Sequence, residues 1–121
     1  MRVDGAFPCT GSWPSSAYAV NCVFATYRTT HYDIYGSRIG INLSWSWYYG
    51  TAADPPGGQV HFKGIMTHEL GHGAYLIDLY PCGLTQTYFE TMCGTFPTTV
   101  SGWLTSLVAD DITSANAIYL P

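Results

Sequence analysis

Residues 68–72 form the pattern H-E-x-x-H, which places a carboxylate between two imidazoles. On an α-helix, residues four apart lie about 40° apart around the axis and roughly 6 Å apart along it, so His68 and His72 can hold one cation between them. Glu69 lies about 100° further round, where it is poorly placed as a ligand but can reach a water molecule bound to that cation. This combination suits zinc, with the carboxylate as general base for hydrolysis.

A zinc ion held by two histidines needs a third protein ligand. Asp78 follows ten residues after His68, and Tyr80 comes two residues later. On an unbroken helix Asp78 would point about 240° away from His72 and lie about 9 Å along the axis, so the helix must end before Asp78 can bind the same ion. Gly73 offers such an end, because glycine is common just past the last helical turn. A loop carboxylate or cap is the alternative interpretation of Asp78.

The longer pattern over residues 68–78, H-E-x-x-H-x-x-Y-x-x-D, resembles the extended zinc motif of the metzincin metalloendopeptidases, H-E-x-x-H-x-x-G-x-x-H/D. Its ending, Asp78-x-Tyr80, is most similar to the snapalysin branch of small secreted neutral proteinases. Residues 91–94, with Met92, lie where the family has its Met-turn, and residues 110–119 are similar to the C-terminal helix of matrixin-like members. At Tyr75 the family has glycine, which lets the chain turn back beneath the metal.

The resemblance implies an α+β, zincin-like fold, in which a small mixed sheet packs on the active-site helix and a Met-turn and C-terminal helix follow. It implies a zinc metalloendopeptidase that hydrolyses protein or peptide substrates, with Glu69 as general base. Tyr80 would donate a hydrogen bond to the oxyanion, and Met92 would form an apolar floor beneath the metal. Three residues would bind Zn²⁺, namely His68, His72 and Asp78.

Three alternatives remain open. Tyr75 in place of glycine is consistent with a degenerate, non-catalytic zinc-binding module. The aromatic content is consistent with an extracellular binding domain in which the motif is incidental. Glu90 could replace Asp78 as third ligand, as a downstream glutamate does in the thermolysin-like class.

The composition indicates a single folded domain over residues 1–121, long enough for one modest core. Charged residues make up 10% of the chain and aromatic residues 16%, which excludes a disordered composition. The net charge of −4 provides no basic surface for nucleic acid or anionic membranes. No apolar run approaches the roughly 20 residues of a membrane span. We expect a monomer that binds neither nucleic acid nor membranes.

Four cysteines in a small chain indicate two disulfides and therefore a secreted, extracellular protein. Three pairings are possible, and we favour Cys9–Cys22 with Cys82–Cys93, because the second bridge would stiffen the segment between the zinc motif and Met92. No C-x-x-C pair occurs, which disfavours a cysteine zinc site. No apolar stretch of a signal peptide follows the first residues, so we expect either the mature portion with an added Met or a fragment whose leader is missing.

The first half of the chain predicts mainly strands. Residues 1–16, rich in Pro, Gly and Ser, predict an irregular lead-in. Residues 17–27 fit both periodicities, and their aromatic and β-branched content favours a strand. Residues 39–48 alternate cleanly and predict a strand with Leu43 on the same face as Trp45 and Trp47, the two tryptophans being core residues. By the resemblance, this strand would edge the cleft and pair with substrate. Residues 50–58 predict a loop.

The active-site helix is predicted to begin near residues 59–62 and to end at about Gly73, with Ile65 on the stripe of the two motif histidines. His61 lies too far from His68 to share its ion and is interpreted as a helix-start or surface residue. Gly71 inside the helix costs about 1 kcal/mol relative to alanine and would be tolerated if another residue packs closely there.

A final helix is predicted near residues 108–119, where an apolar stripe follows helical spacing and Asp110 and Asp111 lie in the first turn, where negative charge suits the helix dipole. The stripe consists of Val108, Ile112, Ala115 and Tyr119. His31 has no motif context, and we leave it unassigned.

Overall fold

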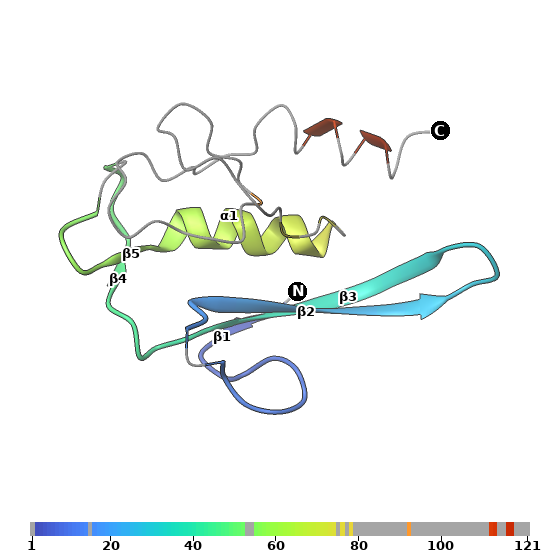
Figure 1. Cartoon of the computed structure of the whole chain (residues 1–121), viewed down its shortest axis with the longest axis horizontal. Helices are drawn as coiled ribbons and strands as arrows, with labels where there is room; N and C mark the ends of the chain where they lie inside the picture. Colours follow the sequence, from blue (N-terminus) through green and yellow to red (C-terminus); the bar gives the residue numbers. More distant parts are fainter. Residues whose placement is uncertain are drawn as a thin grey trace.

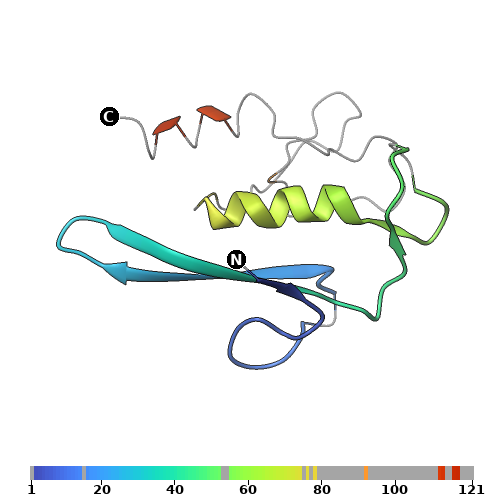
Figure 2. The same cartoon turned by 180° about the vertical axis from the view of Figure 1, so that it is seen from behind.

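The H-E-x-x-H motif lies on a helix that is accompanied by two small sheets in the computed structural model. The structure describes residues 2–14, 16–52, 55–74, 76, 78, 92, 112–113 and 116–117. The strands are β1 (Arg2–Asp4), β2 (Ala19–Tyr27), β3 (Tyr32–Ile41), β4 (Trp47–Tyr48) and β5 (Val60–His61), and the helix is α1 (Phe62–Gly73). Figures 1 and 2 show α1 on one face of β2 and β3, with the loop between β1 and β2 on the opposite face. The predicted α+β class is confirmed at this level.

The larger sheet has the strand order β1-β3-β2, with β1 parallel and β2 antiparallel to β3. The strand predicted over residues 17–27 is therefore confirmed as β2. The prediction of an irregular lead-in over residues 1–16 is wrong at β1, which is a strand. Because β1 has only three residues, it is too short to show the alternation of a strand in its sequence. A bulge at Tyr35 interrupts the β2–β3 register, because Phe24 faces Gly36 and Ala25 faces Ile34.

The strand predicted over residues 39–48 has the wrong bounds. β3 ends at Ile41 because the next residue, Asn42, forms an Asx turn in which its Oδ1 accepts the Ser44 N–H at 3.0 Å. The Asn42 side-chain amide also donates to the Ala17 carbonyl at 3.0 Å. Leu43, predicted on the buried face, is 69% exposed as a result. The alternation continues in the sequence, but the backbone leaves the sheet.

The edge-strand role expected for residues 39–48 is also wrong for Ile39 and Gly40. These residues pair with β1 on one side and with β2 on the other, so a substrate backbone has no free edge to join there. Side-chain alternation reports which face of a strand is buried and carries no information on how many neighbours the strand has.

The core that supports α1 brings Ala19, Val60 and Ile65 together, with Trp45 and Trp47 packed against them. Both indole N–H groups are satisfied by backbone carbonyls, that of Ala17 for Trp45 and that of Asn42 for Trp47, each at 3.1 Å. The interpretation of the two tryptophans as core residues is confirmed, although both remain partly exposed. Val60 and Ile65 belong to β5 and α1, so this core fixes the start of the helix.

The disulfide Cys9–Cys22 joins the loop between β1 and β2 to strand β2, which confirms one of the two predicted bridges. Cys82 and Cys93 lie outside the described residues. Of the predicted final helix, the four described residues are helical: Ile112, Thr113, Asn116 and Ala117. Within the described ranges, no helix is long and apolar enough to cross a membrane.

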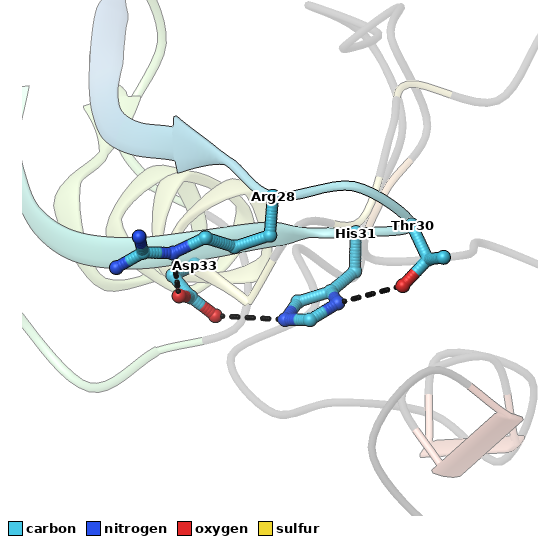
Figure 3. A network of polar contacts seen from close by, with 4 residues as sticks. All are labelled: Arg28, Thr30, His31 and Asp33. Carbon is cyan, nitrogen blue, oxygen red and sulfur yellow. Dashed lines mark hydrogen bonds and ion pairs between the residues drawn. The ribbon is translucent and has the colours of Figure 1, made fainter.

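The loop that joins β2 to β3 extends past the end of α1 in both views and carries His31 (Figures 1 and 2). Figure 3 shows Asp33 between Arg28 and His31, accepting from the Arg28 Nε atom at 2.7 Å and lying 3.1 Å from the His31 Nε2 atom. The Thr30 hydroxyl contacts the other ring nitrogen of His31 at 3.2 Å. These side chains are exposed, so the pairs contribute at most about 1 kcal/mol each.

Candidate metal centre

Helix α1 begins at Phe62, inside the predicted interval, because His61 caps it. The Gly64 N–H donates to the His61 Nδ1 atom at 3.3 Å, which satisfies one of the free amides of the first turn. The His61 Nε2–H donates to the Ala52 carbonyl at 3.0 Å, and the ring is buried. His61 is thus a helix-start residue, as predicted, and the alternative of a surface residue is wrong.

Helix α1 ends at Gly73, which meets the condition that the helix must stop before Asp78. The Ala74 N–H bonds back to the Leu70 and Gly71 carbonyls at 3.1 and 3.0 Å. The Leu76 N–H then returns to the Gly71 carbonyl at 3.0 Å, the six-residue closure that commonly ends helices. Leu76 is buried, so the chain beyond the helix turns back against it and brings Asp78 towards the motif.

The side chains of the three predicted metal ligands converge. The Nε2 atoms of His68 and His72 lie 3.1 Å apart, and the Asp78 Oδ1 atom lies 3.1 Å from the first and 3.3 Å from the second. Among the described residues this is the one cluster of three or more histidine, cysteine or acidic side chains with metal-binding spacing. His68 is buried, whereas the side chain of Asp78 is 38% exposed, so solvent reaches the cluster from the aspartate side.

The spacing of these atoms fits zinc. A tetrahedral zinc ion with bonds of about 2.0–2.1 Å separates neighbouring ligand atoms by about 3.3 Å. The Asp78 Oδ1 atom is fully buried, and no described group donates a well-aligned hydrogen bond to it. A buried carboxylate oxygen without a donor is costly unless a cation satisfies it. Two imidazoles and one carboxylate are also a ligand set that catalytic zinc sites use.

The orientation of the His72 ring is set by the turn after the helix. Its Nδ1–H donates to the Leu76 carbonyl at 2.8 Å. Because Nδ1 carries the proton in the neutral ring, the Nε2 lone pair faces His68 and Asp78. A hydrogen bond from the distal ring nitrogen to a carbonyl is the usual way in which proteins fix a ligating histidine.

Glu69 does not join the three ligand atoms, in agreement with its predicted position on the helix. It is 5% exposed, and its backbone carbonyl accepts a hydrogen bond from the Asn21 side chain on β2. Burial raises its pKa from 4.5 to about 7, an effect that His72 and a hydrogen bond from the backbone of Asn21 oppose and that the charge of Asp78 reinforces. A buried carboxyl with a pKa near neutrality is suited to accept and release a proton.

Gly71 is explained by Met92, which is 2% exposed. A Cβ atom on Gly71 would overlap the Met92 Sδ atom and lie 3.1 Å from its Cε atom. Glycine therefore lets Met92 approach the helix in this arrangement, and the close packing expected at Gly71 is confirmed. The contact places the predicted Met-turn residue against the turn of helix that separates the two histidine ligands.

One residue near the site was missed by sequence reasoning. Asn21 on β2 donates from its side-chain amide to the backbone carbonyl of Glu69 at 2.6 Å. In the sequence, the only indication was that Asn21 is polar although it shares one face of the strand with the apolar residues Ala19 and Val23. The remaining sequence candidates near the site lie outside the described residues: Tyr75, Tyr80 and Glu90.

The geometry of these side chains is the basis for assigning a metal centre, and comparison with known proteins adds nothing to it. No family model, no curated protein and no solved structure matches this chain. The candidate site is therefore defined by the convergence of His68, His72 and Asp78, with Glu69 beside them.

Proposed function

We propose that this chain is a zinc-dependent endopeptidase with a zincin-like fold, in which His68, His72 and Asp78 hold the metal. The observation that carries the proposal is the meeting of three ligand atoms at 3.1–3.3 Å, one of them a buried carboxylate oxygen that lacks a described donor. The resemblance of residues 68–78 to the metzincin motif supports the same ligand set and the same class of substrate, proteins and peptides.

When bound, zinc would polarise the scissile carbonyl and make water nucleophilic near neutral pH. Glu69 would accept the proton of the attacking water and pass it to the leaving amine. Its buried position supports this role, because burial keeps the pKa of the carboxyl near 7 rather than near 4.5. His72, held by Leu76, would keep its Nε2 lone pair directed at the metal throughout the reaction.

Two further roles belong to the proposal. Met92 would provide the apolar floor beneath the metal, and its burial against Gly71 supports this. Tyr80 would donate a hydrogen bond to the oxyanion. An extracellular location is part of the proposal as well, and the Cys9–Cys22 disulfide supports it, since disulfides persist in oxidising compartments.

The test is to measure metal content and casein hydrolysis together, on the wild-type protein and on Glu69→Gln. The expected result is about one zinc per chain in both proteins, with hydrolysis reduced to a small residual rate only in the variant, because glutamine preserves the shape of the side chain but accepts no proton. Apo protein prepared with a chelator should recover activity when zinc is added back.

Two other outcomes would contradict the proposal. Zinc bound without hydrolysis in either protein would identify a non-catalytic zinc-binding module. Less than about one-tenth of an equivalent of zinc in the wild type would mean that His68, His72 and Asp78 form no zinc site.

A further inference from the structure

Asn21 on strand β2 is hydrogen-bonded to the backbone of Glu69. The side-chain amide of Asn21 donates to the Glu69 backbone carbonyl at 2.6 Å, a bond between residues 48 positions apart. This bond joins strand β2 to helix α1 at the residue proposed as general base.

The environment of Asn21 shows that this contact is costly to maintain. Its amide group has a fixed orientation, because only the NH₂ group can donate to a carbonyl. The Oδ1 atom is then left buried, and no described group donates to it. An unpaired buried oxygen is destabilising, and an apolar residue on this face of β2 would avoid it. Nearby Ala19 and Val23 show that small apolar residues fit along this side of the strand.

The end of α1 is shaped for close approach to the same residue. A Cβ atom on Gly73 would lie 3.2 Å from the Asn21 Nδ2 atom and 3.7 Å from the Ser37 Oγ atom. Glycine at this position brings the last turn of the helix down onto the sheet, so that Asn21 reaches the Glu69 carbonyl directly. Ser37 lies under the same turn and has no described hydrogen bond to Glu69, so it serves as a natural control.

We propose that Asn21 is a positioning residue that holds Glu69 in place as general base. The assignment rests on the proposed hydrolytic function. Asn21 has no described contact with the three ligand atoms, and it acts through its hydrogen bond to the Glu69 backbone. A carboxylate that must move a proton within the short lifetime of a transition state loses efficiency when its position varies by as little as about 1 Å.

The test compares Asn21→Ala, Asn21→Asp and the control Ser37→Ala in peptide hydrolysis and in zinc affinity measured by chelator competition. Asn21→Ala should lower kcat at least about tenfold while KM and the zinc Kd stay within about twofold. Asn21→Asp should lower kcat further, because it replaces the donor with a carboxylate that repels the Glu69 carbonyl. Ser37→Ala should keep wild-type values.

A double-mutant cycle separates positioning from general damage. In the Glu69→Gln background, Asn21→Ala should cause no additional loss of residual activity, because there is no base left to position. A loss that persists in that background would overturn the inference, and so would an Asn21→Ala protein with wild-type kcat or a Ser37→Ala protein with the same loss.

An NMR measurement on the wild-type protein covers the case in which the variants do not fold. The side-chain amide protons of Asn21 should exchange slowly and show nuclear Overhauser effects to the Hα protons of Gly73. If this contact is missing from an active enzyme, the inference is overturned and the proposed function stands. If the contact is present but the wild type hydrolyses no peptide, the proposed function fails and the positioning role fails with it.

Discussion

Leu76 binds the helix with both of its backbone groups. Its N–H returns to the Gly71 carbonyl at 3.0 Å, and its carbonyl accepts the His72 Nδ1–H at 2.8 Å. The same turn that ends α1 therefore also orients one of the two histidines of the motif. In this chain the position of Asp78 and the orientation of the His72 ring are not independent, because both depend on Leu76.

The histidine tautomers are a direct test of this arrangement. In metal-free protein above about pH 7.5, His72 should carry its proton on Nδ1, whereas His61 should carry it on Nε2, because its Nδ1 accepts from Gly64. Long-range ¹H–¹⁵N correlation spectra distinguish the two forms. Addition of zinc should shift the Nε2 resonances of His68 and His72 and leave those of His61 unchanged. A His72 ring protonated on Nε2 would contradict this orientation.

Asp78 should be necessary for tight zinc binding. Asp78→Asn removes the charge from the third ligand position and should weaken zinc binding by on the order of a hundredfold in chelator competition. The matched control is Asp33→Asn, which removes another partly exposed carboxylate, from the β2–β3 hairpin, and should leave the zinc Kd unchanged. Equal affinities for wild type and Asp78→Asn would remove Asp78 from the ligand set.

Gly71→Ala should destabilise the protein even though alanine is the better helix former. The added Cβ atom would overlap the Met92 Sδ atom, and such overpacking typically costs about 1–3 kcal/mol in the free energy of unfolding. In a Met92→Ala background the same change should be neutral or stabilising by up to about 1 kcal/mol. Gly57→Ala, where the new Cβ meets nothing, should change stability by less than about 0.5 kcal/mol. Denaturant unfolding measures all of these proteins, and additive effects at 71 and 92 would refute the contact.

Glu69 should make the metal-free protein less stable as the pH rises. Its pKa is raised from 4.5 to about 7, so between these values the folded state binds more protons than the unfolded state. The free energy of unfolding therefore falls through this interval and levels off above pH 7, by on the order of 3 kcal/mol in total. Glu69→Gln lacks this contribution and shares all others, so the difference between the two proteins isolates it.

The measurement is urea unfolding of both proteins in the presence of a chelator, from about pH 4 to about pH 8. The stability of wild type relative to Glu69→Gln should decline between pH 4.5 and 7. Parallel curves would show that the carboxyl is not buried in the folded protein. With zinc present the decline should be smaller, because a nearby cation favours the ionised carboxylate.

The elements that could be predicted from sequence are those that depend on interactions between residues close together in the chain. The helix, its end before Asp78 and the cap at His61 depend on residues within a few positions of one another. The close approach at Gly71 was also predictable, because glycine inside a helix requires a packing reason. Which residue packs there, Met92, was predicted only through the family resemblance.

The features that could not be predicted depend on contacts between distant segments. Asn42 ends β3 through a turn that is stabilised by Ala17, 25 residues earlier, and nothing in the alternating pattern indicates it. Asn21 reaches Glu69 across 48 residues, and a single polar residue in a strand does not reveal which distant group it will contact. The three residues of β1 owe their conformation to pairing with β3 rather than to any pattern of their own.

The candidate metal ligands lie close together in the sequence, whereas the candidate base is hydrogen-bonded to a residue far from it in the sequence. His68, His72 and Asp78 fall within one stretch of eleven residues, whereas the hydrogen bond that holds Glu69 spans 48. Local contacts form early in folding, because long-range contacts must first overcome the entropy of closing a large loop. An intermediate that contains α1 and its terminating turn could therefore capture a metal ion before β2 docks. Under the proposed function, a newly made chain would carry metal before it could cleave its neighbours.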